Sequence, residues 1–281
     1  MLKFYLQLVK TPQTGLLIFT AFAGYQSAVN AGSMALSQAD LILAFVGLLL
    51  VVCGTTSLNM VFDHDIDSLM ERTKNRPIPK GVISTMQASI LSWLSIIIGT
   101  AINYKISLIY SFVVLLGFLF DFIVYTIWLK RRSAWSIVFG GLSGGMPVLA
   151  GRVLATGSVD MIGILLAIAI LLWIPTHILT LAMNHDKDYK LAGVPTFPNK
   201  LGFKATRYII AITNLLTAII LVFVGYNLNI NEMGIQILRI GSLVLFILSF
   251  RLVIDPSRER NFTLFKYASL FMAGVMLIFI L

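Results

Sequence analysis

Residues 40–62 read DLILAFVGLLLVVCGTTSLNMVF, and residues 63–81, DHDIDSLMERTKNRPIPKG, follow them directly. Between 41 and 62 the chain carries no charge. A helix of this length, rising about 1.5 Å per residue, crosses the roughly 30 Å hydrocarbon core of a bilayer. Acidic and basic residues then crowd into the next segment. This change predicts a membrane helix that ends at a polar interface.

The composition extends this prediction to the whole chain. Of its 281 residues, 58% are hydrophobic and only 12% are charged, with a mean hydropathy of +0.91, whereas soluble domains contain about 25% charged residues. Nine apolar runs are long enough to span a bilayer, at about 13–33, 40–62, 82–102, 106–127, 135–156, 160–183, 205–226, 234–254 and 262–281. Their continuous apolarity favours helices over the alternating strands of a barrel. We therefore predict an all-α integral membrane protein, with residues 1–281 as one domain of nine transmembrane helices in a single bundle.

The basic residues predict how this bundle is oriented. All but three of the 21 fall at the N-terminus or in alternate loops on one side; the exceptions are Lys105, Arg152 and Arg239. Basic loops stay in the cytoplasm, so we expect a cytoplasmic N-terminus. The same rule accounts for the net charge of +9, and we expect no nucleic-acid partner. Residues 1–10 resemble neither a cleavable signal nor a mitochondrial presequence, which favours the plasma membrane of a prokaryote.

The first charged loop, at about 59–81, carries an oxygen-rich series. Asn59, Asp63 and Asp67 recur every fourth residue, so they project from one side if the preceding helix continues. Such a wall suits Mg²⁺, which proteins hold through one or two carboxylates together with substrate phosphates. The basic residues that follow it are Arg72, Lys74, Arg76 and Lys80. These bases alone are equally well explained by membrane orientation.

A second inner loop, at about 183–204, repeats this design. Asp186, Asp188 and Tyr189 follow the end of an apolar run, and basic residues and a proline-containing turn come after them. Two carboxylate clusters on one side of the membrane could hold a diphosphate through bridging Mg²⁺ ions. If that diphosphate carries an isoprenoid tail, the surrounding helices supply an apolar cavity for it. The alternative class is a transporter, whose acidic residues are expected near the middle of the membrane.

Five ordered segments carry a resemblance to a known family. They are N-x3-D-x-D-I-D-x2-M-x-R-T-x-N-R-P from Asn59, YTIWLKRRS from Tyr125, GGLSGGMPVLAG from Gly140, PTH from Pro175 and DYKLAGVPTFP from Asp188. Together they resemble the intramembrane (UbiA-type) prenyltransferase superfamily and, within it, the members that attach a farnesyl group to haem.

The resemblance implies a reaction and its partners. A farnesyl group would pass from farnesyl diphosphate to the 2-vinyl group of haem b, with addition of water, giving haem O and diphosphate. Haem b would be a substrate and Mg²⁺ the cofactor, and a haem A synthase or a terminal oxidase assembly is a candidate partner. A quinone-precursor ring or an archaeal lipid intermediate remains an alternative acceptor, and a haem sensor or assembly factor an alternative class.

The resemblance also implies roles for single residues. The metal-binding acidic motifs fall on Asn59, Asp63, Asp67, Asp186 and Asp188. The expected diphosphate-binding residues are Arg72, Lys74, Arg76, Lys130 and Arg131. Tyr125 and Tyr189 are candidates to stabilise a carbocation through their rings, and His177 is a candidate to bind haem iron or a propionate, or else to hydrogen-bond a neighbour.

Helical geometry adds three expectations from the residues themselves. Asp65 lies on the opposite side from Asp63, so we expect it to pair with a basic loop residue. Asp121 could be a cavity wall or part of a structural hydrogen bond. Arg152 is expected to extend its charge to the membrane interface.

Overall fold

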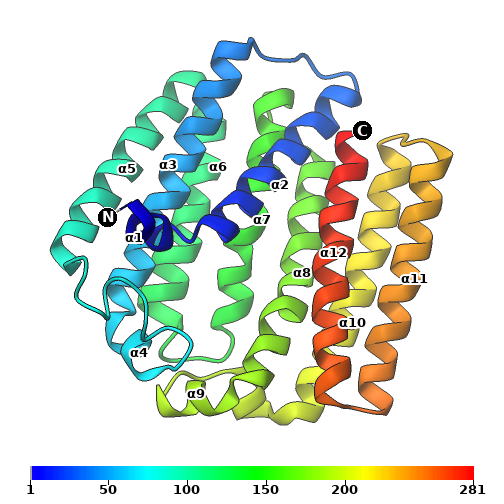
Figure 1. The fold of residues 1–281 in the computed structure, drawn as a ribbon. Helices are drawn as coiled ribbons and strands as arrows, with labels where there is room; N and C mark the ends of the chain where they lie inside the picture. The colour runs from blue at the N-terminus through cyan, green and yellow to red at the C-terminus, as the bar shows by residue number, and fades with distance from the viewer. Residues whose placement is uncertain (1) are drawn as a thin grey trace.

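The computed structural model describes residues 2–281, and over this range the chain is helical and has no strand (Figure 1). The long helices are α2 (Thr11–Asn30), α3 (Gln38–Phe62), α5 (Thr85–Ile106), α7 (Ser136–Thr156), α8 (Met161–Asn184), α10 (Phe197–Asn227), α11 (Glu232–Ile254) and α12 (Arg258–Ile280). Helix α6 (Leu108–Phe118) continues into the π-helix η1 (Leu119–Leu129). Three short helices, α1 (Leu2–Leu8), α4 (His64–Leu69) and α9 (Asp186–Leu191), complete the chain.

The helices agree closely with the predicted apolar runs. Within residues 2–281, eight are long and apolar enough to cross a membrane: α3, α5, α6 with η1, α7, α8, α10, α11 and α12. The run predicted at 13–33 forms α2, a helix of 20 residues with several polar side chains. The all-helical membrane fold is therefore confirmed, while a ninth crossing by α2 stays a prediction.

The helices form one bundle that α2 and α12 close. Helix α2 packs against α7 and α12, α3 packs against α5, and α8 packs against α7, α10 and α12. At the end of α2, Asn30 Nδ2 donates a hydrogen bond of 3.0 Å to the carbonyl of Ile280. Large apolar side chains cover the outside of the bundle, as Ile97 and Phe112 illustrate at 62% and 58% exposed. This surface suits contact with lipid, which hides it from water.

The two acidic loops lie at the same end of the bundle. Helix α4 follows the end of α3, helix α9 follows the end of α8, and Figure 1 places both at the lower end of the molecule. Helix α10 also starts there. Gly202, with φ 81° and ψ 164°, interrupts α10, so its first turn belongs to the loop region and its apolar part begins close to the predicted residue 205.

Arg152 is placed differently from the prediction. It does not extend to the membrane interface but is buried, with 4% of its surface exposed. Its guanidinium donates to Asp160 at 2.6–3.0 Å and to Ser27 Oγ at 2.9 Å. The next loop supplies the carboxylate, and a paired guanidinium can stay inside the bundle.

Close backbone contact between α2 and α7 requires glycine at two positions. A Cβ atom on Gly151 would lie 1.8 Å from the carbonyl oxygen of Ala21, and one on Gly24 would lie 2.1 Å from that of Val148. Both contacts are far inside van der Waals distance, so these helices could not approach as they do with larger residues. The GGLSGGMPVLAG segment thus serves helix packing, as small residues commonly do in membrane bundles.

We predict that Gly151→Ala lowers the stability of the bundle. The added methyl group must push α2 away from α7, and overpacking of this kind costs about 1–3 kcal/mol or more. Thermal unfolding of the purified protein in detergent measures the effect. Gly274→Ala in α12 is the matched control, because nothing lies within 4 Å of a Cβ atom there; equal melting temperatures for the two variants would contradict the prediction.

Candidate active site

The predicted series Asn59, Asp63 and Asp67 lines one cavity of about 350 Å³. Helix α3 stops at Phe62, but the Asp63 N–H still donates to the Asn59 carbonyl at 3.0 Å and the Asp67 N–H to the Asp63 carbonyl at 2.7 Å. These bonds preserve helical spacing across the junction with α4. The three residues are buried, with 3–6% of their surface exposed. The expected shared face therefore exists, although the helix itself does not continue.

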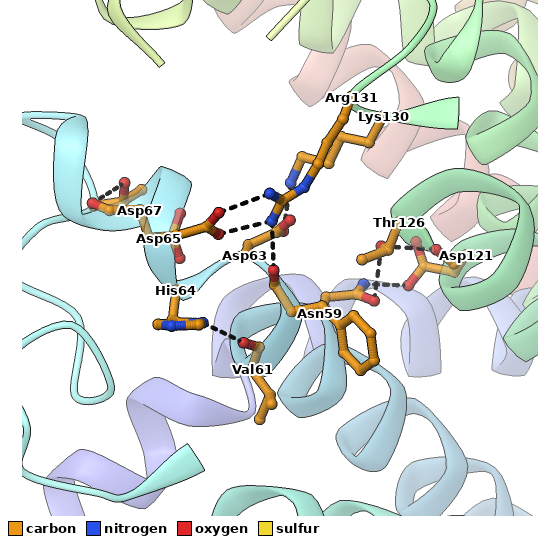
Figure 2. Close-up of polar contacts among 12 residues, drawn as sticks. Asn59, Val61, Asp63, His64, Asp65, Asp67, Asp121, Thr126, Lys130 and Arg131 are labelled. Carbon is orange, nitrogen blue, oxygen red and sulfur yellow. Dashed lines mark hydrogen bonds and ion pairs between the residues drawn. The ribbon is translucent and has the colours of Figure 1, made fainter. Parts of the chain in front are cut away.

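Each of the two buried carboxylates has a basic partner. Arg76 Nη1 lies 2.5 Å from Asp67 Oδ2, and Lys130 Nζ forms an ion pair with Asp63 Oδ2. Lys130 comes from the end of η1, so this second pair ties that helix to the α3–α4 junction (Figure 2). A buried charge without a partner costs several kcal/mol. Each ion pair offsets this cost for both of its charged groups.

A hydrogen-bond network fixes Asn59 against η1 (Figure 2). Asn59 Nδ2 donates to Asp121 Oδ2 at 2.8 Å, and Thr126 Oγ1 donates to Asn59 Oδ1 at 3.0 Å. Thr126 Oγ1 also reaches the Asp121 carbonyl at 3.0 Å, five residues back. Asp121 lines the cavity as well, so it is both a wall of the cavity and a structural acceptor. The π-helix, a form often found at functional sites, brings Asp121 and Thr126 together.

Two tyrosines and the second inner loop complete the cavity. Tyr125 and Tyr189 line it, together with Val194, Pro195, Thr196 and Phe197. The ring of Tyr125 lies 5.5 Å from Lys130 Nζ and packs so closely on Gly140 that a Cβ atom there would lie 2.7 Å from the ring. Loops distant in sequence therefore share one cavity with acidic, basic and aromatic walls.

The carboxylates of the second loop do not line this cavity. Asp186 Oδ2 pairs with Lys190 Nζ at 2.5 Å, and Asp188 Oδ2 lies 3.7 Å from His185 Nδ1. Tyr189, between them and Lys190 in sequence, does enter the cavity. Helix α9 therefore contributes Tyr189 to the cavity, and not its two carboxylates.

Two of the predicted diphosphate-binding residues also lie outside the cavity. Lys74 pairs with Glu71 at 2.7 Å on the surface. Arg131 holds both carboxylate oxygens of Asp65 at 2.7 Å and the Phe62 carbonyl at 2.7 Å (Figure 2). Asp65 thus pairs with a basic loop residue as expected, and the Arg131 hydrogen bond lowers the pKa of Asp65 to about 2. By contrast, Arg72, Arg76 and Lys130 do line the cavity.

His177 lies outside the cavity, between aromatic rings. Its imidazole stacks on Trp173 and Phe265, with ring centroids 5.1 Å and 4.9 Å away, and its Nδ1 lies 3.4 Å from Ser269 Oγ. The neighbouring residues Ile178 and Leu179 face the cavity instead. This position matches the expectation of a histidine bonded to a neighbour, and a haem-binding role for it stays a prediction.

Lys10 is a cavity residue that sequence reasoning missed. Its charge is expected only to orient the chain in the membrane, yet it lines the cavity together with Gln13. Its backbone has a φ of 48°, in the left-handed region, an uncommon conformation for a residue other than glycine. Burial, with a further contribution from Arg76, lowers the pKa of Lys10 to about 8. No pattern in the sequence marks it, because the turn before α2 alone directs it inward.

Two unpartnered oxygens fit the donor chemistry of a hard cation. Asp63 Oδ1 and Asp186 Oδ1 are buried and accept no hydrogen bond, which is unusual for buried polar atoms. Among residues 2–281, no group of three acidic, histidine or cysteine side chains forms a preassembled metal site. Mg²⁺ does not require a preassembled site, because proteins commonly bind it through one or two carboxylates while phosphates and water supply its other ligands. The site therefore suits a diphosphate bound with Mg²⁺.

This geometry is that of a membrane prenyltransferase, and the family comparison agrees. The model of the UbiA prenyltransferase family matches residues 17–275, so the chain belongs to this family. Two archaeal relatives are each named protoheme IX farnesyltransferase. That of Thermofilum pendens is 38% identical, covering 95% of this chain and 94% of its own, and that of Korarchaeum cryptofilum is 37% identical, covering 93% and 87%.

Solved structures share the fold. A digeranylgeranylglyceryl phosphate synthase superposes with a TM-score of 0.80 at 22% identity, covering 99% of this chain and 97% of its own. A UbiA homolog from Archaeoglobus fulgidus bound to DMAPP and Mg²⁺ superposes with a TM-score of 0.70 at 16% identity, covering 98% and 99%. At these identities the similarity establishes the helical fold of the chain.

We predict that Lys10 makes diphosphate binding pH-dependent. A bound anion favours the charged amine, so affinity should fall as pH rises through about 8, by up to about tenfold per pH unit. Lys10→Arg should keep its charge and retain affinity to higher pH. Calorimetric titration of the protein with inorganic diphosphate and Mg²⁺ measures the affinity at each pH. Diphosphate itself also ionises, and the ratio of wild-type to Lys10→Arg affinity cancels that contribution.

Lys80→Arg is the control for the Lys10 experiment. Lys80 is exposed and lies outside the cavity, so its replacement should leave the wild-type profile unchanged. If Lys10→Arg also followed the wild-type profile, Lys10 would not be the group that titrates.

Proposed function

We propose that this protein is a Mg²⁺-dependent prenyltransferase that transfers a farnesyl group from farnesyl diphosphate to the 2-vinyl group of haem b. The observation that carries the proposal is the pairing of Asp63 with Lys130 and of Asp67 with Arg76 in one cavity. The acceptor comes from the relatives that are 37–38% identical and named protoheme IX farnesyltransferase.

The paired charges can separate when a diphosphate binds. Asp63 and Asp67 would turn to the metal, while Lys130 and Arg76 would turn to phosphate oxygens. Bound there, Mg²⁺ would neutralise the charge of the departing diphosphate. Arg72 and Lys10, which line the same cavity, would add positive charge. Asn59 would hold the wall in place through Asp121 and Thr126. A further metal contact from Asp186 would require α9 to shift when the substrate binds, because Asp186 does not line the cavity here.

An apolar pocket of about 50 Å³ beside the site can take the first few carbons of an isoprenoid tail and marks the path of the remainder between the helices. It shares Thr56 and Asp121 with the cavity and continues between α2, α3, α6 and α7. Its apolar lining consists of Leu17, Leu48, Val51, Val52, Val114, Phe118, Met146 and Pro147. Burial of apolar chain here contributes about 0.8 kcal/mol per methylene, which orients the diphosphate end toward the charged cavity.

The proposed reaction balances without a redox partner. The allylic C–O bond breaks and its electron pair leaves with diphosphate. The first carbon of the farnesyl cation bonds to the terminal vinyl carbon, and the cation that forms beside the ring takes up water and releases a proton. The rings of Tyr125 and Tyr189 face the cavity and can stabilise positive charge by about 0.5–2 kcal/mol.

The position of the acidic residues favours an enzyme over a transporter. Asp63, Asp67, Asp186 and Asp188 all follow the ends of α3 and α8, whereas a transporter would be expected to place them near the middle of the membrane. We also propose nine crossings, counting α2, with the N-terminus and both active-site loops on the cytoplasmic side of a prokaryotic plasma membrane. A haem A synthase would be a suitable neighbour, because it would consume the product.

Product analysis tests the proposed function. The purified protein, farnesyl diphosphate, Mg²⁺ and haem b should give a hydroxyethylfarnesyl haem, detected by mass spectrometry, and one diphosphate per product. Unmodified haem together with a prenylated quinone-precursor ring or archaeal lipid intermediate, supplied in parallel, would reassign the acceptor. Haem binding without diphosphate release would indicate a sensor or assembly factor.

We predict that Asp63→Asn and Asp67→Asn each lower turnover at least about 100-fold, as expected when a charge that acts in the transition state is removed. Each variant should stay folded but with a lower melting temperature, because asparagine keeps the shape of the side chain and leaves Lys130 or Arg76 without its ion-pair partner. Steady-state diphosphate release and thermal unfolding measure the two effects. Asp65→Asn is the matched control, since Asp65 pairs with Arg131 outside the cavity; near-normal turnover of Asp63→Asn would exclude the proposed metal site.

A further inference from the structure

A second hollow, the basic groove, lies beside the active-site cavity. Its volume is about 350 Å³, and it is lined by Arg131, Arg132, Tyr189, Lys190, Gly193, Val194, Pro195, Asn199 and Lys200. The lining contains four basic residues and no acidic one. These residues come from the turn after η1, from α9, from the turn between α9 and α10, and from the start of α10.

The basic groove and the cavity share a wall. Tyr189, Val194 and Pro195 line both hollows. A molecule that lay across these three residues would have one edge in the basic groove and the opposite edge in the cavity. Such a molecule must be charged at one edge and apolar at the other.

Two of the four basic residues in the groove are not neutralised. Arg131 is paired with Asp65 and Lys190 with Asp186. Within residues 2–281, Arg132 and Lys200 have no ion-pair partner. Membrane orientation explains why basic residues occur in these loops, but it does not explain why they surround one hollow next to the cavity. Two free positive charges suit a ligand with two carboxylates.

The wall between the hollows is held in a defined shape. Val194 is buried, and Gly193 has a φ of 66°, in the left-handed region. Asn199 Nδ2 donates to the Val194 carbonyl at 3.0 Å, and Asn199 Oδ1 accepts from the Thr196 N–H at 2.7 Å. The turn that separates the groove from the cavity is therefore fixed before any ligand binds.

We propose that the basic groove binds the two propionates of the haem acceptor, through Arg132 and Lys200. This inference rests on the proposed function and adds the binding site of its acceptor. In haem b the propionates lie on the edge of the macrocycle opposite the vinyl groups. With the propionates in the groove, the ring crosses Tyr189, Val194 and Pro195, and a vinyl group enters the cavity where the farnesyl cation forms. The diphosphate does not compete, because Arg76 and Lys130 hold it inside the cavity.

The test compares two acceptors that differ only in propionate charge, haem b and its dimethyl ester. The wild-type protein, the variant Arg132→Gln/Lys200→Gln and the control Lys80→Gln/Arg258→Gln are placed in nanodiscs of neutral phosphatidylcholine. The control removes two exposed inner-loop charges outside the groove. Haem affinity is measured by absorbance titration, and kcat/KM is measured for both acceptors and for farnesyl diphosphate.

The groove variant is expected to lose the preference for haem b over its dimethyl ester. The wild type should prefer haem b to its ester, and the groove variant should lose about tenfold in affinity and in kcat/KM for haem b, with little change for the ester or in the KM for farnesyl diphosphate. Equal losses for both acceptors, or the same loss in the control, would overturn the proposal.

Two further outcomes distinguish failure of the proposed function from failure of the groove assignment. If the wild type binds haem through the groove but farnesylates neither acceptor, the proposed function fails and the groove assignment stands. If the variant differs from the wild type only in nanodiscs that contain anionic phosphatidylglycerol, the groove binds a lipid headgroup and the assignment to haem fails.

Discussion

The carboxylates of Asp63 and Asp67 lie below the surface at the end of a largely apolar bundle, where an uncompensated charge would cost several kcal/mol. Lys130 and Arg76 compensate them. This requirement ties together three parts of the chain, because the carboxylates follow α3, Lys130 ends η1 and Arg76 belongs to the loop after α4. The same pairs keep acidic and basic groups close enough to bind a metal and a phosphate together.

The fold serves this charged cavity by separating two environments. Apolar helices surround a pocket that continues from the cavity along α3, and the polar loops at one end hold the charges (Figure 1). In the proposed reaction, an isoprenoid diphosphate would span both environments. The acceptor would span a second boundary, between the basic groove and the cavity. Each substrate would then be oriented by the position of its charged group.

Much of this arrangement could be predicted from the sequence, because long apolar runs and every-fourth spacing follow from local geometry. Local geometry was enough to predict the helices, the shared face of Asn59, Asp63 and Asp67, and the pairing of Asp65. Two features depended on tertiary contacts that a sequence does not display. Lys10 enters the cavity through the turn before α2, and Arg152 is buried because the following loop supplies Asp160.

The second acidic loop shows where the pattern was least informative. Asp186 and Asp188 resemble the first cluster in sequence, yet α9 directs Tyr189 into the cavity and pairs both carboxylates locally. A one-residue difference in spacing is enough to turn a short helix by about 100°. Similarly, the predicted single helix at 106–127 contains a π-helix, from which Thr126 bonds to Asn59.

In the proposed mechanism, Asp63 exchanges Lys130 for a metal when a prenyl diphosphate binds. The most direct measurement is the Mg²⁺ dependence of the affinity for a non-hydrolysable farnesyl diphosphate analogue, in the wild type and in Asp63→Asn. Mg²⁺ should raise the affinity of the wild type at least about tenfold, equal to 1.4 kcal/mol, and should leave the affinity of Asp63→Asn nearly unchanged. An equal enhancement by Mg²⁺ in both proteins would contradict it.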